Sequence, residues 1–188
     1  MKKTESNFQY ILRLALTLLV ITSVVAAALA GVNMLTAPVI ARQTAEKTQM
    51  AIEAVLPGGG EEMAALPAVD FEGADLVSKV YKGEAGYAVE VTPAGFDNTI
   101  TMMVGVDENG KVLGIDIISH TETPSLGAVA DADTPAGQAF REQFVGVSGS
   151  AAVTKDGGTM DSITGATITS RAVCAGVNAA LACVAALD

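Results

Sequence analysis

The longest feature of the hydrophobic pattern is a stretch without any charged residue, residues 14–41, most of whose side chains are apolar. About 20 such residues cross the hydrocarbon core of a bilayer, where only a helix pairs its own backbone groups. The pattern therefore predicts one transmembrane helix over 14–35, after an N-terminal segment 1–13. Pro38 is expected to end or kink this helix.

Segment 36–60 is predicted to form a second, amphipathic helix and a connection, because apolar and small residues recur there at helical spacing. Pro57 and the glycines that follow it are expected to stop the helix. Residues 58–74 have no clear period and indicate a surface connection. The expected buried face comprises Ile40, Ala41, Thr44, Thr48, Ala51, Ile52 and Val55.

Beyond this connection the hydrophobic period changes to two, which predicts β-strands. The strands are expected at 76–83, 86–93, 99–106 and 112–120, with a turn at 107–110 between the last two. Strands joined by such short connections form an antiparallel meander. A short helix is predicted over 136–145, with Ala139, Phe140 and Phe144 facing inward.

The last predicted helix, 170–187, is almost uncharged and rich in small residues, with Asn178 as its one strongly polar interior residue. Its length lies at the lower limit for crossing a membrane. We expect it to be buried against the sheet, with membrane contact as the alternative. The predicted fold class is α+β: an antiparallel sheet packed with helices over 61–188, preceded by one transmembrane helix.

Charge predicts the orientation of the transmembrane segment. The net charge is -10, yet Lys2, Lys3 and Arg13 precede the apolar stretch. The positive-inside rule therefore places the N-terminus in the cytoplasm and 61–188 outside, in a single-pass protein of the cell inner (plasma) membrane. The alternative is a cleaved signal peptide, since residues 28–30 resemble a small-residue cleavage site. An uncleaved anchor is favoured because the apolar run continues past that site.

Composition excludes several classes of function. An acidic chain lacks the clustered cations that neutralise nucleic-acid phosphates. Two cysteines and one histidine are too few for a disulfide scaffold or a usual zinc site, so no metal site is expected. Cys174 and Cys183 lie on opposite sides of one predicted helix and are expected to be buried and unpaired. The sequence has neither a phosphate-binding Gly-Lys-Ser/Thr motif nor a dinucleotide glycine fingerprint.

The candidate chemistry lies just before the last helix, in Asp161-Ser162-Ile163-Thr164-Gly165-Ala166-Thr167. Serine and threonine at a helix start are common capping residues, and glycine permits a turn, so the motif is explained by capping alone. The same features also suit an anion, because the free N–H groups and the dipole of a helix start attract phosphate. The spacing alone does not choose between the two.

This motif resembles the flavinylation motif of FMN-binding domains, in which the final threonine carries FMN through a phosphoester bond. The resemblance implies covalent FMN at Thr167, a phosphate turn shaped by Thr164 and Gly165, and Asp161 as a residue that orients the loop or assists the modification. Ala166 completes the implied cofactor-binding motif. No catalytic residue is expected in the chain itself, because the cofactor carries the redox chemistry.

A second stretch, residues 120–127, is similar to the family pattern His-x-Glu-Thr-Pro-Gly-Leu-Gly that follows the last strand. The resemblance implies that His120, Glu122 and Thr123 help to build the flavin pocket. Ser125 stands where the family has glycine, so the turn must be made without that glycine.

A third stretch, 95–100, departs at Asp97 and Asn98 from the family's aromatic residue followed by two glycines, and no flavin role is carried onto it.

Across its whole length the chain resembles the G-subunit family of the Rnf complex. This implies an electron-transfer subunit of an ion-translocating ferredoxin:NAD+ oxidoreductase, which works with other membrane and peripheral subunits and needs a flavin transferase to attach FMN from FAD. The alternatives are the C subunit of the sodium-translocating NADH:quinone reductase, which tends to be longer, and a non-redox scaffold subunit whose threonine-rich loop only caps a helix. An extracellular reductase module is a third, for which additional catalytic domains would be expected.

Overall fold

The structure, a computed structural model, describes residues 7–64 and 71–187. Its residue contacts divide the chain into two units that meet within the first helix, at Ala45 and Glu46. Much of the predicted segment 1–13 and residues 65–70 of the predicted connection lie outside the described residues.

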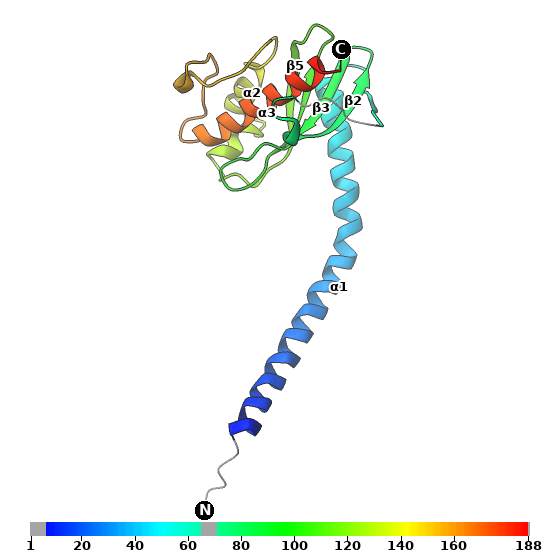
Figure 1. Cartoon of the computed structure of the whole chain (residues 1–188), viewed down its shortest axis with the longest axis vertical. Helices are drawn as coiled ribbons and strands as arrows, with labels where there is room; N and C mark the ends of the chain where they lie inside the picture. The colour runs from blue at the N-terminus through cyan, green and yellow to red at the C-terminus, as the bar shows by residue number, and fades with distance from the viewer. Residues whose placement is uncertain (1–6, 65–70, 188) are drawn as a thin grey trace, which may run out of the picture. The chain divides into compact units, whose positions relative to one another are not determined.

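The first unit is the N-terminal part of helix α1 (Asn7–Val55), drawn from blue to cyan in Figure 1. Its large apolar side chains, such as Leu18 and Val24, are exposed along the whole apolar stretch. The hydroxyls of Thr17, Thr22 and Thr36 donate to backbone carbonyls four residues earlier, at 2.8–3.0 Å. These polar groups are therefore satisfied within the helix, as a helix in lipid requires.

The length of the apolar stretch fits a bilayer. At 1.5 Å per residue, segment 14–35 spans about 33 Å, close to the ~30 Å hydrocarbon core. Two described helices are long and apolar enough to cross a membrane, α1 and α3 (Thr167–Ala185), but most of α3 is buried by the rest of the protein. These features support a membrane-anchored protein with its apolar helix at the N-terminus.

Pro38 does not end the helix, and α1 continues without interruption to Val55. The segment after Pro38 is therefore helical, as predicted, but it does not form a separate second helix. Proline removes one backbone hydrogen bond, which the flanking helical turns tolerate. Of the predicted buried face, only its end is confirmed, because Ala51, Ile52 and Val55 are buried but Ile40 is exposed.

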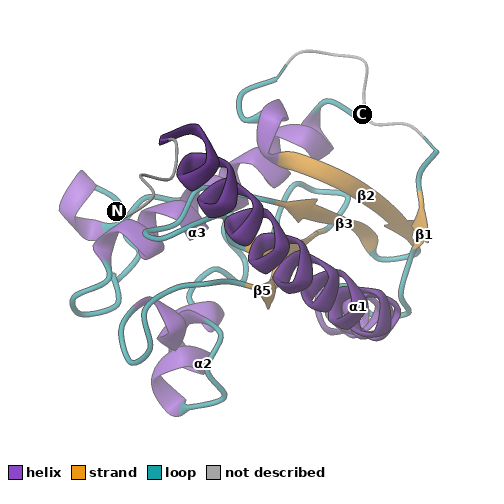
Figure 2. Cartoon of the chain, turned by 90° about the horizontal axis from the view of Figure 1, so that it is seen from below, coloured by secondary structure: helices purple, strands orange, loops and turns teal. Residues whose placement is uncertain are grey.

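The second unit contains a five-stranded antiparallel sheet in the order β1-β2-β3-β4-β5. Figure 2 shows β2 and β3 side by side, with β1 next to β2. The four predicted strands are confirmed, and β1 was not predicted because two exposed glutamates carry no hydrophobic alternation. The strands are β1 (Glu61–Glu62), β2 (Val77–Gly83), β3 (Gly86–Val91), β4 (Thr101–Val106) and β5 (Val112–Ser119).

Both faces of the sheet are covered, so neighbouring residues of one strand enter different cores. Val104 packs in the larger core, with α3 and α2 (Pro135–Glu142). Met103 packs in the smaller core, with Ile52 and Val55 at the end of α1. Figure 1 shows α3, in orange and red, crossing the green strands. Its burial confirms the expectation that it packs on the sheet.

Two details of the helices differ from the predictions. Helix α2 ends at Glu142, and Ala139 is exposed although it was expected to face inward. The buried stripe instead follows Gly137, Phe140 and Phe144, whose spacing of three and four residues is that of one helix face. Helix α3 begins at Thr167, three residues earlier than predicted, and this difference decides the geometry of the site.

Among the described residues of this unit there are also three short 3-10 turns. They are η1 (Ala74–Leu76), η2 (Gly127–Ala130) and η3 (Thr154–Asp156). Turn η1 begins at the end of the stretch predicted as a surface connection, and η2 begins at Gly127, the last residue of the predicted pocket segment 120–127. Turn η3 belongs to the loop between α2 and α3, which contacts the start of α3.

Candidate functional site

A cavity of about 250 Å³ opens beside the first turn of α3. Its walls come from four segments that are far apart in the sequence. They are Phe96; Glu122, Thr123, Leu126 and Gly127; Lys155; and residues 165–169. The fold thus brings the predicted motif and the predicted pocket segment together around one cavity.

Thr167 is the first residue of α3, directly after the N-cap residue Ala166. The methyl side chain of Ala166 makes no capping hydrogen bond at this helix start. The first N–H groups of a helix have no partner within it and carry the positive end of its dipole. Gly165 precedes them with a φ of 78°, a left-handed conformation that glycine adopts without strain. An anionic group at Thr167 therefore meets a favourable helix end.

The three hydroxyls of this turn have different partners. The Thr169 hydroxyl donates to Glu122 Oε2 at 2.5 Å. The Ser170 hydroxyl accepts from the backbone N–H of Ile163 at 3.0 Å and donates to the carbonyl of Ala166. The Thr167 hydroxyl accepts from Lys155 Nζ at 3.0 Å and lines the cavity. Thr167 therefore does not cap the helix, and the capping interpretation fails for this residue.

Glu122 joins three segments of the site and is only 6% exposed. Its Oε1 accepts from the backbone N–H of Phe96 at 2.8 Å, while Oε2 accepts from Thr169. Any side chain at residue 127 would collide with the Glu122 carboxylate and the Thr169 hydroxyl, which explains the glycine there. The buried carboxylate thus fixes the Phe96 loop and the first turn of α3 relative to each other.

His120 lies two residues before Glu122 in the sequence, but it does not line the cavity. Its Nδ1 accepts from the backbone N–H of Glu122 at 3.2 Å, and its Nε2 lies 3.6 Å from Asp131 Oδ2. Ser125 has a φ of 64°, so the position where the family has glycine does require a left-handed residue. A serine makes this turn at a cost of about 1 kcal/mol.

Asp161 and Thr164 lie on a different cavity, of about 490 Å³, between the motif loop and α2. The Gln143 side chain holds the backbone of Asp161: its Oε1 accepts from the N–H at 2.7 Å and its Nε2 donates to the carbonyl at 3.1 Å. Of the predicted site residues, Thr167, Gly165, Ala166, Glu122 and Thr123 lie together, whereas Asp161, Thr164 and His120 do not line that cavity.

Sequence reasoning missed Lys155, Leu126 and Phe96 as residues of the cavity. One signal was available for Lys155, because it is the sole lysine or arginine between Arg141 and Arg171. Its neighbour Asp156 pairs with Arg171, and this hydrogen-bonded pair lowers the pKa of the Asp156 carboxyl and raises the pKa of the Arg171 guanidinium. Phe96 and Leu126 are 64% and 42% exposed at the cavity wall.

The residues present fit a flavin mononucleotide. The Lys155 ammonium and the start of α3 suit a phosphate group, while Phe96 and Leu126 offer apolar surface of the kind that an isoalloxazine ring covers. The polar side chains of Glu122 and Thr123 lie on the same cavity. One site thus combines an anion-binding end with apolar and hydrogen-bonding walls.

The fold and this site define a flavin-binding domain that follows an apolar anchor helix in the sequence. Residues 95–182 match the family model described as FMN-binding domain, a range that includes β4, β5, every residue of the cavity wall and most of α3. Residues 1–55 match a second family model, described as RnfG N-terminal region. The two matches together account for the helix and the site.

Curated relatives specify the family. The chain is 34% identical to the G subunit of the Na(+)-translocating ferredoxin:NAD(+) oxidoreductase complex of Acetobacterium woodii, with 94% of this chain and 93% of the relative aligned. It is 32% identical to the G subunit of the ion-translocating oxidoreductase complex of Methanosarcina acetivorans, over 97% and 99% of the two chains. The corresponding subunit of Pseudomonas aeruginosa is 41% identical over 92 residues, 47% of this chain and 43% of the relative. The chain belongs to the G-subunit family of the Rnf ion-translocating oxidoreductase complex.

Proposed function

We propose that the chain relays electrons through one FMN, held covalently by a phosphoester at Thr167, within an ion-translocating ferredoxin:NAD+ oxidoreductase. The observation that carries this proposal is the position of the Thr167 hydroxyl. It stands at the start of α3, on the cavity wall, and contacts a cation instead of capping the helix. A redox cofactor of this kind supplies electron transfer at its ring, and the protein supplies its position.

The attachment reaction balances with FAD as donor. The Thr167 oxygen attacks the phosphorus of the FMN half, a P–O bond of the pyrophosphate breaks, and AMP leaves. The hydroxyl proton passes to a base of the flavin transferase, so that threonine and FAD yield threonyl-FMN, AMP and a proton. The oxidation state of the flavin does not change. A covalent bond keeps the cofactor on a domain outside the cytoplasm, where mass action would otherwise empty the site.

Several groups on the cavity wall have a task toward this cofactor. Lys155 and the free N–H groups of α3 hold the phosphate, and Gly165 lets it approach the backbone. Phe96 and Leu126 flank the ring, and a buried carboxylate fixes the Phe96 loop through the backbone hydrogen bond. Glu122 and Thr123 are the side chains on the wall proposed to make polar contacts with the ribityl chain or the ring.

Two other predicted residues act outside this cavity. Asp161 lies on the second cavity, where an approaching transferase can contact it. His120 accepts from the backbone N–H of Glu122 and so supports the wall from behind.

The same proposal includes the placement of the chain. The N-terminus is cytoplasmic, a single helix over 14–35 crosses the plasma membrane, and the FMN-binding domain lies outside, where it meets the other subunits of the complex. The match of residues 1–55 to the family's N-terminal region supports this complex over the sodium-translocating NADH:quinone reductase.

The test replaces Thr167 and measures the intact mass of the full chain made with and without a flavin transferase. Wild type gains the mass of one FMN less one water, and Thr167→Ala gains none, because no nucleophile remains. Thr167→Ser keeps the hydroxyl and is expected to be modified. Because Thr167 does not cap α3, Thr167→Ala should change the free energy of unfolding by less than about 0.5 kcal/mol.

Thr159→Ala is the matched control, since Thr159 is an exposed threonine of the preceding loop that does not line the cavity. It is expected to gain FMN as wild type does. A wild-type chain that gains no mass beside a transferase active on another protein in the same cells would disprove the covalent attachment.

A further inference from the structure

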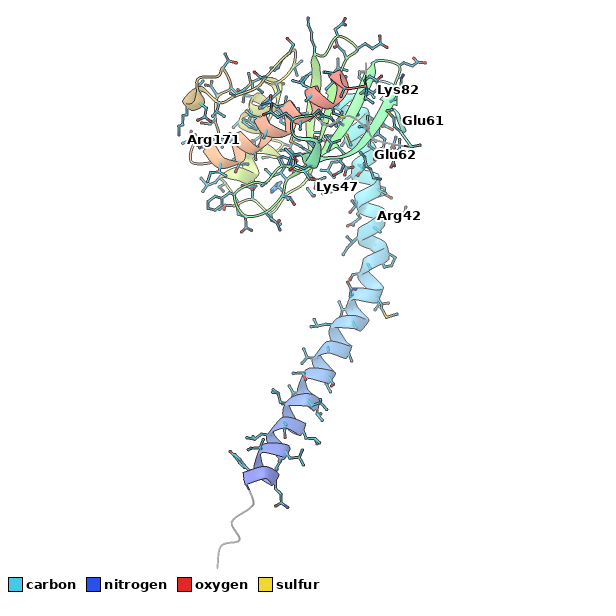
Figure 3. All side chains as sticks on the ribbon, in the orientation of Figure 1. Arg42, Lys47, Glu61, Glu62, Lys82 and Arg171 are labelled. Atoms are coloured by element: carbon cyan, nitrogen blue, oxygen red, sulfur yellow. The ribbon has the colours of Figure 1, made fainter. Side chains whose placement is uncertain are left out.

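The loop before the motif contacts the start of α3 at two points, one helical turn apart. Lys155 Nζ donates to Thr167 Oγ1 at 3.0 Å. The next residue, Asp156, pairs in a bidentate manner with Arg171: Nε donates to Oδ2 and Nη2 to Oδ1, both at 2.6 Å. Figure 3 labels Arg171 on α3. Adjacent loop residues thus engage Thr167 and the residue four positions after it.

The loop itself is closed by backbone hydrogen bonds. Thr154 N–H donates to the carbonyl of Met160 at 2.9 Å, and Met160 N–H donates to that of Ala152 at 3.0 Å. The side chains of Val153 and Met160 are buried in the larger core. Residues 155 and 156 therefore extend from a turn whose base is fixed, and the ion pair with α3 sets where that turn meets the helix.

We infer that Lys155 assists the attachment of FMN through its direct contact with the Thr167 oxygen, and that Asp156 and Arg171 are positioning residues whose ion pair holds Lys155 against Thr167. The inference rests on the proposed function, because it concerns the same threonine. The ammonium donates to the threonine oxygen, so the hydroxyl proton stays free to leave. Its charge stabilises the negative charge that develops on that oxygen and afterwards neutralises the phosphodiester.

The first experiment compares rates of attachment in the full chain in detergent, with purified flavin transferase and FAD, followed by intact mass. Lys155→Met is expected to lower the rate about 10-fold or more, because it removes a charge-assisted hydrogen bond to the reacting oxygen. Lys155→Arg keeps a cationic donor and should retain most of the rate. Lys111→Met, after the turn between β4 and β5, is the control for loss of a lysine and should behave as wild type.

Two further readouts separate direct assistance by Lys155 at the Thr167 oxygen from a merely structural role. The advantage of wild type over Lys155→Met should shrink as ionic strength rises, because salt screens an exposed charge. In the modified proteins, the phosphorus resonance of the phosphodiester should differ between wild type and Lys155→Met. A residue that only stabilises the loop would change neither.

The ion pair is tested by reversing it. Asp156→Arg and Arg171→Asp alone should each slow attachment, and the double variant Asp156→Arg/Arg171→Asp should recover much of the rate. In a Lys155→Met background Asp156→Arg should cause no further loss, because the pair acts through Lys155.

The outcomes distinguish the two hypotheses. If wild type gains no FMN, both the proposed function and this inference fail. If wild type is modified, and Lys155→Met is modified at the same rate with an unchanged phosphorus resonance, only the role of Lys155 is disproved. Additive losses in the Lys155→Met background would disprove the role assigned to the ion pair.

Discussion

Glu122 shows how much of the site depends on one buried carboxylate. Its two oxygens take hydrogen bonds from the Phe96 backbone and the Thr169 side chain, while its own N–H is bound by His120. A buried donor left without a partner costs more than a normal hydrogen bond contributes. Glu122 therefore stabilises the site by holding the backbone at Phe96 and the first turn of α3 together.

We expect Glu122→Ala to lower the free energy of unfolding by about 2 kcal/mol, because it leaves the Phe96 N–H and the Thr169 hydroxyl without their acceptor. Chemical denaturation in detergent, followed by circular dichroism, measures the change. Glu142→Ala, at an exposed glutamate at the end of α2, is the control and should stay within about 0.5 kcal/mol of wild type. Equal stabilities of the two variants would contradict the bridging role.

At the scale of elements, α3 connects the site to the core. Its first turn carries Thr167 and Thr169, and its later turns bury Cys174 and Cys183 as free thiols against the sheet. Asn178 adds a polar anchor, because its side chain bonds both the N–H and the carbonyl of Ala151. This contact fixes the beginning of the loop that carries Lys155.

Burial raises the pKa of the Cys174 and Cys183 thiols to about 11. At pH 8 the thiolate fraction alone should slow alkylation by iodoacetamide about 100-fold relative to an ordinary thiol. Intact mass should show no alkylation of the native chain and two modifications in urea. Prompt alkylation of the native protein at pH 8 would contradict the burial of the two thiols.

Because the folded state favours the protonated thiols, their contribution to the free energy of unfolding is complete below about pH 9 and is lost as the pH rises through 11.

At the scale of the whole molecule, the chain combines an apolar helix with an acidic FMN-binding domain. The helix exposes its apolar side chains, while the domain buries its own in two cores. Charged residues such as Glu61, Glu62 and Lys82, labelled in Figure 3, belong to the domain. These surfaces suit two different solvents, which is the physical basis for the proposed placement across a membrane.

The proposed orientation predicts which residues an impermeant maleimide reaches in intact cells. In a chain carrying Cys174→Ala and Cys183→Ala, Glu108→Cys in the exposed β4–β5 turn should be labelled from outside. Ser6→Cys should be labelled only after the membrane is disrupted, because the positive-inside rule places it in the cytoplasm. The reverse pattern of labelling would overturn the orientation.

The sequence by itself determined most of the elements and singled out the proposed attachment residue. Hydrophobic period is a local property, so it predicted the apolar helix, four strands and the buried α3, and the motif pointed to Thr167. It did not determine that α1 continues through Pro38. The conformational preference of one proline does not show whether the flanking helical turns are stable enough to tolerate the lost backbone hydrogen bond.

Only the tertiary structure decided which residues share the cavity. Glu122 meets Thr169 across a separation of 47 positions, and Lys155 reaches Thr167 from a separate loop. It also separated Asp161 and Thr164 from Thr167, since a left-handed Gly165 turns the chain between them. Contacts of this kind depend on how the sheet, the loop and α3 pack, and packing is not encoded in the spacing of residues along the chain.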